Sequence, residues 1–202
     1  PNGTLWLGSL EGYLLYVPKN ENHAIALPSR ELAGSSIEKI LPVNNDSLLI
    51  GTSKKGMLAY NTRRNTFSQP LLHNRNGSPE IFVRDILQYN PGEFWAATED
   101  GLFCYTSSNV RQIRKIYGDL YSLSDNALYS ISRDREGGLW ISSYFGGINY
   151  LPNRPLQFEK YYPGPRHPSF TGNVIREITK DQYGQFWIGT EDAGLNKADF
   201  KK

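Results

Sequence analysis

The sequence predicts an all-β fold made of β-propeller blades, and three observations lead to this class. Glycine and proline are frequent, with 19 and 12 of the 202 residues, and aromatic residues make up 13% of the chain. This composition favours short strands joined by turns. Short apolar runs are separated by Gly or Asn-Asp turns, without the period of an amphipathic helix. Finally, one motif recurs at a nearly constant interval.

The recurring motif consists of an aromatic or apolar pair, a small-residue turn, a glycine and a second apolar strand. The second residue of the pair is the anchor, and the five anchors are Trp6, Leu49, Trp95, Trp140 and Trp187. They are 43 to 47 residues apart. Helical repeats can also have this period, but the β-branched and aromatic runs favour a four-stranded propeller blade. The anchors are expected to form the apolar contacts between neighbouring blades.

Each repeat is expected to supply four antiparallel strands in the same order. The first strand precedes the anchor strand, at residues 37–41, 83–87, 128–131 and 175–178. The third strand follows the glycine of the motif, at 57–60, 102–105 and 148–151, and the fourth lies at 67–71, 110–116 and 158–162. Hairpin turns are predicted at 134–138 and 181–184, because Asp binds backbone N–H groups and Gly tolerates positive φ.

The strand count predicts an open arc of about 4.5 blades. The first repeat begins at its second strand and the last ends after its third, so the two ends cannot share one four-stranded blade. We therefore expect a single domain, an incomplete arc of a larger, seven-bladed propeller. The repeats lie at about 1–34, 35–78, 79–124, 125–170 and 171–202. Open strand edges and apolar faces at the ends of the arc favour self-association with another copy.

Charge and cysteine content exclude several classes of function. The net charge is +2, from 22 basic and 20 acidic side chains, without a block of like charge. The chain therefore lacks the electrostatic pattern of nucleic-acid or membrane-surface binding. The single cysteine, Cys104, excludes an internal disulfide and a cysteine-based zinc site. No apolar stretch approaches the roughly 20 residues of a membrane helix.

No catalytic residue, metal ligand or cofactor is predicted. His23, His73 and His167 lie in different repeats beside turn residues, which is typical of surface loops. The turns that begin at Asp134 and Asp181 resemble the Asp-box of sialidase-like propellers, so a glycoside hydrolase remains an alternative. Their glycine follows the aspartate by three residues instead of two, and the box is a structural turn that supplies no nucleophile.

A ligand-binding surface is predicted at two groups of side chains. Four residues occupy the same place, directly after the opening apolar residue of each first strand: Glu38, Arg84, Tyr129 and Arg176. They are expected to surround the central channel, where Arg and Tyr can bind sugar hydroxyls, carboxylates or sulfates. Tyr144 and Phe145 form an exposed aromatic pair in the turn where other repeats carry Glu-Asp. A solvated ring and core packing across a blade edge are the respective alternatives.

Two segments carry a resemblance to a known family. Residues 123–150 are similar almost throughout to the repeat of the two-component regulator propeller, and residues 173–196 are similar to it again. The chain departs from that repeat at Leu49, at Ala97 and Ser142, and in the turns at 44–47 and 90–93. The resemblance implies the periplasmic sensor region of a hybrid two-component histidine kinase. Full-length members place propellers outside the membrane and kinase and receiver domains inside the cell.

From this resemblance we expect a periplasmic sensor propeller that binds an oligosaccharide and signals to a histidine kinase outside this chain. No catalysis and no nucleic acid are expected in this region. Membrane attachment, dimerisation and the phosphorelay would come through other parts of the parent protein. Because propellers host unrelated functions, a scaffold that docks a protein without a small-molecule ligand is the alternative.

Overall fold

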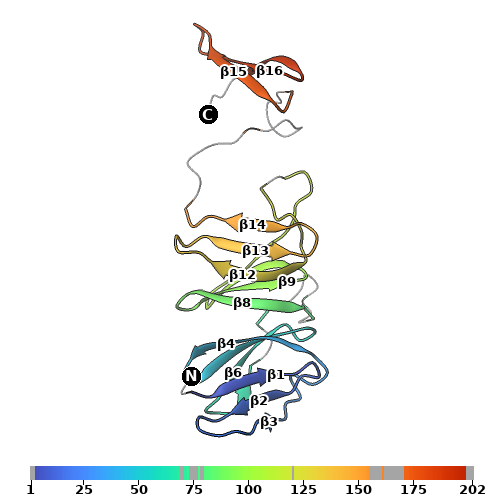
Figure 1. Cartoon of the computed structure of the whole chain (residues 1–202), viewed down its shortest axis with the longest axis vertical. Helices are drawn as coiled ribbons and strands as arrows, with labels where there is room; N and C mark the ends of the chain where they lie inside the picture. Colours follow the sequence, from blue (N-terminus) through green and yellow to red (C-terminus); the bar gives the residue numbers. More distant parts are fainter. Residues whose placement is uncertain are drawn as a thin grey trace. The chain divides into compact units, whose positions relative to one another are not determined.

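Seventeen β-strands and no helix occur in the residues that the computed structural model describes, which are 3–68, 71–72, 77, 80–119, 121–154, 161 and 171–198. The chain consists of two units, residues 1–154 with four sheets and residues 155–202 with one (Figure 1). Every strand pair is antiparallel. The predicted all-β class is confirmed. In the described part of the chain, no helix is long and apolar enough to cross a membrane.

The four sheets of the first unit follow the chain in order. The first sheet contains β1 (Leu5–Gly8), β2 (Leu14–Val17) and β3 (Ile25–Leu27). The second contains β4 (Ile37–Asn44), β5 (Ser47–Thr52), β6 (Met57–Asn61) and β7 (Thr66–Phe67). The third contains β8 (Val83–Asn90), β9 (Glu93–Thr98), β10 (Gly101–Thr106) and β11 (Val110–Ile113). The fourth contains β12 (Leu128–Arg133), β13 (Leu139–Ser143) and β14 (Ile148–Leu151), and the fourth strand predicted at 158–162 lies, except for Tyr161, outside the described residues.

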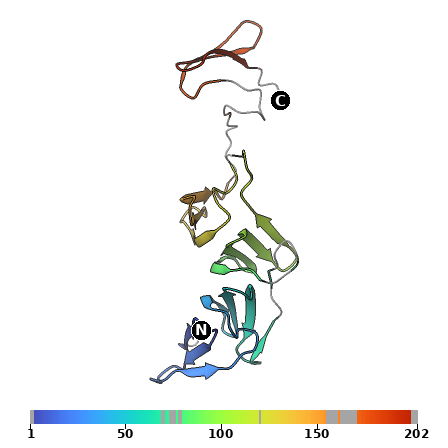
Figure 2. The same ribbon diagram turned by 90° about the vertical axis from the view of Figure 1, so that its right-hand side faces the viewer.

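Within the first unit, each sheet packs against the next one. Strand β4 lies against β1 and β8, and β8 lies against β12, so the first strands of successive sheets are neighbours. The first and fourth sheets lie at opposite ends of this unit in both views (Figures 1 and 2). The sheets of the unit therefore form an open arc, as predicted.

An apolar layer fills each of the three contacts between sheets. The anchor of one sheet packs into an apolar cluster with residues of the following sheet: Trp6 packs against the cluster that contains Leu48 and Ile50, and Leu49 shares a cluster with Val83 and Ile86. Trp95 shares a buried cluster with Leu128 and Ile131 and is only 5% exposed. Each layer removes large apolar side chains from water, which is the main favourable contribution to folding.

Trp140 differs from the expectation that every anchor is buried, because its side chain is 46% exposed. It belongs to the last sheet of the first unit, and the described residues of this unit include no further sheet to cover it. Its ring instead lies 4.8 Å from that of Tyr150, measured between centroids. The burial of an anchor therefore depends on the sheet that follows it.

The second unit contains β15 (Ile175–Lys180), β16 (Phe186–Thr190) and β17 (Gly194–Ala198). Its predicted hairpin turn is present, with Gly184 at φ +82°. The Asp181 Oδ1 accepts hydrogen bonds from the backbone N–H of Tyr183 and Gln185, and its Oδ2 accepts one from Trp187 Nε1 at 2.9 Å. The turn at Asp134 in the first unit has the same three bonds.

The Asp181 turn should make the second unit sensitive to acid. The Trp187 indole N–H, and then the backbone N–H of Gln185, hold the pKa of the Asp181 carboxyl below its usual value. A lowered folded pKa stabilises the unit above the unfolded pKa of about 3.9, and this contribution disappears as the pH falls through the lowered value. An NMR titration of the Asp181 carboxyl carbon in the full chain should give a midpoint below 3.9. The variant Asp181→Asn should remove the acid-dependent shift of the Trp187 indole signal, and a midpoint at or above the usual value would contradict the prediction.

Candidate functional site

Each first strand from β4 onward carries a β-bulge, and the bulged residue is one of the predicted binding residues. In β4 the pairing moves from Ile37 directly to Lys39 while β5 advances by one residue, so Glu38 has no partner of its own. The same shift leaves out one residue in each of three other strands: Arg84 in β8, Tyr129 in β12 and Arg176 in β15. A bulge bends its strand and redirects the extra side chain.

The residue that follows each second strand is held beside the bulge. The N–H of Glu99 donates to the carbonyl of Phe82 at 3.1 Å, and the N–H of Tyr144 donates to that of Ala127 at 2.9 Å. Bulge and turn side chains therefore meet in pairs. The pair in the third sheet is the ion pair of Arg84 and Glu99. In the fourth sheet both partners are tyrosines.

Side chains of the third and fourth sheets form one continuous surface in the first unit. The Arg84 guanidinium carbon lies 4.0 Å from the ring centroid of Phe82 and 4.3 Å from that of Tyr129. The Tyr129 and Tyr144 centroids are 5.5 Å apart, and those of Tyr144 and Phe145 are 4.4 Å apart. We call these five residues, Phe82, Arg84, Tyr129, Tyr144 and Phe145, the aromatic–arginine patch.

The patch combines exposed rings with a cation that is held in place. Phe145 is 86% exposed, and Tyr129 and Tyr144 are also exposed. The Arg84 Nη2 donates to Glu99 Oε1 at 2.7 Å, while its Nε is buried without a hydrogen-bond partner in the described structure. A guanidinium between two rings is stabilised by cation–π attraction. The patch therefore offers apolar ring faces next to a neutralised pair of charges.

The turn that carries Tyr144 and Phe145 has a fixed backbone. The N–H of Phe145 donates to Asp125 Oδ2 at 3.2 Å, and the Ser143 hydroxyl donates to the carbonyl of Gly147 at 3.0 Å. Gly147 has φ +74°, a conformation that favours glycine. A Cβ at Gly146 would lie 2.3 Å from Ser124 Oγ, so this position requires glycine as well. The two rings are thus presented on a rigid turn.

The structure brings together four of the six predicted binding residues. Glu38 lies exposed on β4, where its Oε1 accepts a hydrogen bond from Ser36 Oγ at 2.6 Å. Arg176 belongs to the second unit, where its Nη2 pairs with Glu191 Oε2 at 2.8 Å. A ring formed by all four bulge residues therefore stays a prediction.

Sequence reasoning did not select Phe82 or Glu99. Phe82 lies two residues before the bulge, and Glu99 begins the Glu-Asp turn whose place Tyr144 and Phe145 take in the next repeat. The pairing of bulge and turn would have pointed to Glu99. No comparable sequence signal places Phe82 beside Arg84.

The histidines take no part in this site as far as the structure describes them. His23 is exposed, and its Nε2 lies 3.1 Å from Glu21 Oε2. His73 and His167 lie outside the described residues. No group of three or more His, Cys, Asp or Glu side chains that could hold a metal ion occurs among the residues with described positions.

Five successive antiparallel sheets, four of them with a bulge in the first strand, are typical of a β-propeller built of blades. The family model of the two-component regulator propeller matches residues 122–145 and 169–192, which include two of the predicted repeat cores. These two segments therefore carry two-component regulator propeller repeats. No curated protein is similar to the chain at a significant level.

Several solved structures have a similar fold. The extracellular domain assigned to the hybrid two-component system BT3049 of B. thetaiotaomicron is 28% identical over 99% of this chain and 25% of its own, with a TM-score of 0.63. The corresponding domain of BT4673 from the same organism is 18% identical over 98% of this chain and 27% of its own, with a TM-score of 0.62. PorZ of Porphyromonas gingivalis, a surface component of a secretion system, is 16% identical over 95% of this chain and 30% of its own, with a TM-score of 0.54. The BT4673 domain and PorZ show the fold alone. This chain spans about a quarter of the length of the BT3049 and BT4673 domains.

Proposed function

We propose that this chain is part of the extracytoplasmic sensor propeller of a hybrid two-component signalling protein, and that it binds an oligosaccharide at the aromatic–arginine patch. The observation that carries the proposal is the exposed, rigidly held ring pair beside the Arg84–Glu99 ion pair. The similarity to extracellular domains of hybrid two-component systems supports a periplasmic location and a histidine kinase elsewhere in the parent protein. Catalysis is not part of this proposal.

The chemistry of the patch fits a sugar chain. The planes of Tyr144 and Phe145 meet at 75°, so the two rings form an exposed corner against which the C–H face of a pyranose can stack. Sugar hydroxyls can accept hydrogen bonds from Arg84 and donate to Glu99. Because Glu99 already balances the charge of Arg84, the patch does not require an acidic sugar.

Ligand binding at this place can be coupled to the arrangement of the blades. The patch joins β8 of the third sheet to β12 and the turn after β13 of the fourth. A ligand that touches both sheets binds best when they keep this arrangement, and only such differential affinity can shift a conformational equilibrium. The signal would then pass to a dimer of the parent protein, through parts outside this chain.

Calorimetric titration of the full chain with neutral and acidic oligosaccharides tests this proposal. The double variant Tyr144→Ala with Phe145→Ala should weaken binding at least about tenfold. The reason is that stacking of a sugar on an aromatic ring contributes on the order of 1 kcal/mol per ring. The control is Tyr117→Ala, which removes an equally exposed ring of the same unit outside the patch and should leave the affinity unchanged. If no glycan produces heat, the proposal fails and the protein-docking scaffold is favoured. Release of new reducing ends would instead support a hydrolase.

A further inference from the structure

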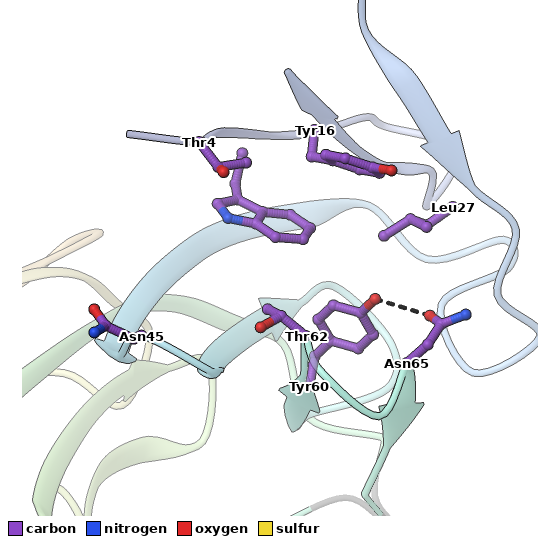
Figure 3. Close-up of a pocket in the computed structure, with 8 residues that line it drawn as sticks. Thr4, Tyr16, Leu27, Asn45, Tyr60, Thr62 and Asn65 are labelled. Carbon is purple, nitrogen blue, oxygen red and sulfur yellow. Dashed lines mark hydrogen bonds between the residues drawn. The ribbon is translucent and has the colours of Figure 1, made fainter. Parts of the chain in front are cut away.

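A second candidate site lies between the first two sheets of the first unit. A pocket of about 350 Å³ opens there (Figure 3). Such a volume lies within the range of small-ligand pockets, roughly 300–1,000 Å³. The pocket, which we call the Trp6 pocket, is lined by Thr4, Trp6, Tyr16, Leu27, Asn45, Tyr60, Thr62 and Asn65. None of these eight side chains is charged at neutral pH.

Aromatic rings from both sheets form the apolar part of the pocket. The Trp6 centroid lies 5.4 Å from that of Tyr16 and 5.8 Å from that of Tyr60. Tyr60 is packed in turn against Phe67 at 4.6 Å, which fixes its ring. In Figure 3, Tyr16 and Leu27 face Tyr60 and Asn65 across the opening. Tyr60 is only 2% exposed, so the ring surfaces that a ligand can contact are those of Trp6 and Tyr16, which are partly exposed.

The polar groups of the pocket have hydrogen-bonding capacity left. The Tyr60 hydroxyl donates to Asn65 Oδ1 at 2.8 Å, which orients the amide so that Asn65 Nδ2 can donate to a ligand. Burial raises the pKa of the Tyr60 hydroxyl, so it keeps its proton at neutral pH. Asn45 and Thr62 also line the pocket.

Trp6 differs from the other three tryptophans at its indole N–H. In the other sheets this group donates to a carboxylate oxygen: Glu93 for Trp95 at 2.8 Å, Asp134 for Trp140 at 3.0 Å and Asp181 for Trp187 at 2.9 Å. Among the residues with described positions, Trp6 has no such carboxylate partner. Its N–H is therefore a further donor at a pocket that lacks charge.

We propose that the Trp6 pocket binds an uncharged pyranose, such as the terminal residue of a neutral oligosaccharide. The rings supply stacking surfaces for the C–H face of the sugar, and the amides, hydroxyls and indole N–H supply partners for its hydroxyl groups. An ionised ligand would have to leave water for a pocket without a counter-charge, which is unfavourable.

This pocket is separate from the aromatic–arginine patch, and its ligand does not depend on the patch. Asn45 lies in the turn where β4 ends, and Asn65 lies between β6 and β7. The bulge and turn residues of the patch lie near the starts of β8 and β12 and at the end of β13. The two sites therefore occupy opposite ends of the strands in the first unit.

Calorimetry of the full chain with lactose, maltose and cellobiose, and with glucuronic acid as the charged probe, tests the pocket. The variant Asn65→Gly removes the amide but keeps the positive φ of +53°. Its matched control is Asn20→Gly, which removes an amide at φ +72° in the same unit outside the pocket. A neutral disaccharide should bind at least about fivefold more weakly to Asn65→Gly, and with unchanged affinity to Asn20→Gly.

Trp6→Phe provides a second test, because it keeps a ring and removes the indole donor. It should weaken binding of the same disaccharide, whereas Trp187→Phe should not. The proposal is overturned if both pocket variants bind every probe like the wild type, or if glucuronic acid binds as tightly as the neutral sugars. Comparison with the Tyr144 and Phe145 double variant separates the two sites. Binding lost only in that double variant refutes the pocket and leaves the proposed function intact. Binding lost only in the pocket variants supports the pocket and refutes binding at the aromatic–arginine patch.

Discussion

Replacement of Trp95 by alanine is expected to destabilise the first unit by about 3–5 kcal/mol, as for other large aromatic residues removed from a core. Trp95 is 5% exposed and belongs to the same buried cluster as Leu128 and Ile131 of the next sheet. Its loss leaves a cavity in the layer between the third and fourth sheets. Because small domains are stable by only about 5–15 kcal/mol, the variant loses a large part of its stability.

Trp140→Ala is the matched control, since Trp140 occupies the same position in the following repeat of the same unit. It is 46% exposed and contacts mainly Tyr150 of its own sheet. Its replacement should cost only about 1–2 kcal/mol, from the smaller buried area and the lost bond to Asp134. Guanidinium denaturation of both variants, followed by circular dichroism, measures the difference. Equal destabilisation would show that the anchors do not act through the next sheet.

The repeat made much of this fold predictable from the sequence. The anchor spacing and the Asp-Gly turns are local signals. The first strands predicted at 37–41, 83–87, 128–131 and 175–178, and the third strands predicted at 57–60, 102–105 and 148–151, lie close to their observed positions. The exposure of Trp140 was not predictable in the same way. It depends on whether another sheet covers that residue, which the motif around Trp140 does not encode.

The candidate site was predictable only in part. Equal position in the repeat selected Arg84 and Tyr129, but the contact between them is made across two sheets and depends on how those sheets pack. The bulge that redirects both side chains has no turn residue or glycine of its own in the sequence. Phe82 is also part of the site because of how the chain packs around Arg84, which no local sequence pattern encodes.

The role of Asp85 could not be predicted from the sequence, because its one carboxylate connects three sheets. It follows the bulge residue in β8 and is largely buried, with 15% of its side chain exposed. Its Oδ1 lies 2.7 Å from the ammonium of Lys39 in the second sheet, and its Oδ2 accepts the backbone N–H of Ile131 in the fourth at 3.0 Å. The carboxylate therefore links the second, third and fourth sheets where their first strands meet.

We expect Asp85→Ala to destabilise the first unit by about 2–4 kcal/mol, because it leaves a buried N–H without its partner and removes a charge-assisted bond. Lys39→Met removes only the ion pair, whose lysine is 38% exposed, and should cost less than about 1 kcal/mol. Asp85→Asn is not conservative, since both Lys39 and Ile131 present donors and the amide can accept through only one atom. Denaturation curves should therefore rank Asp85→Ala and Asp85→Asn well below Lys39→Met. If Lys39→Met were as damaging as Asp85→Ala, the ion pair and not the link to Ile131 would hold the sheets together.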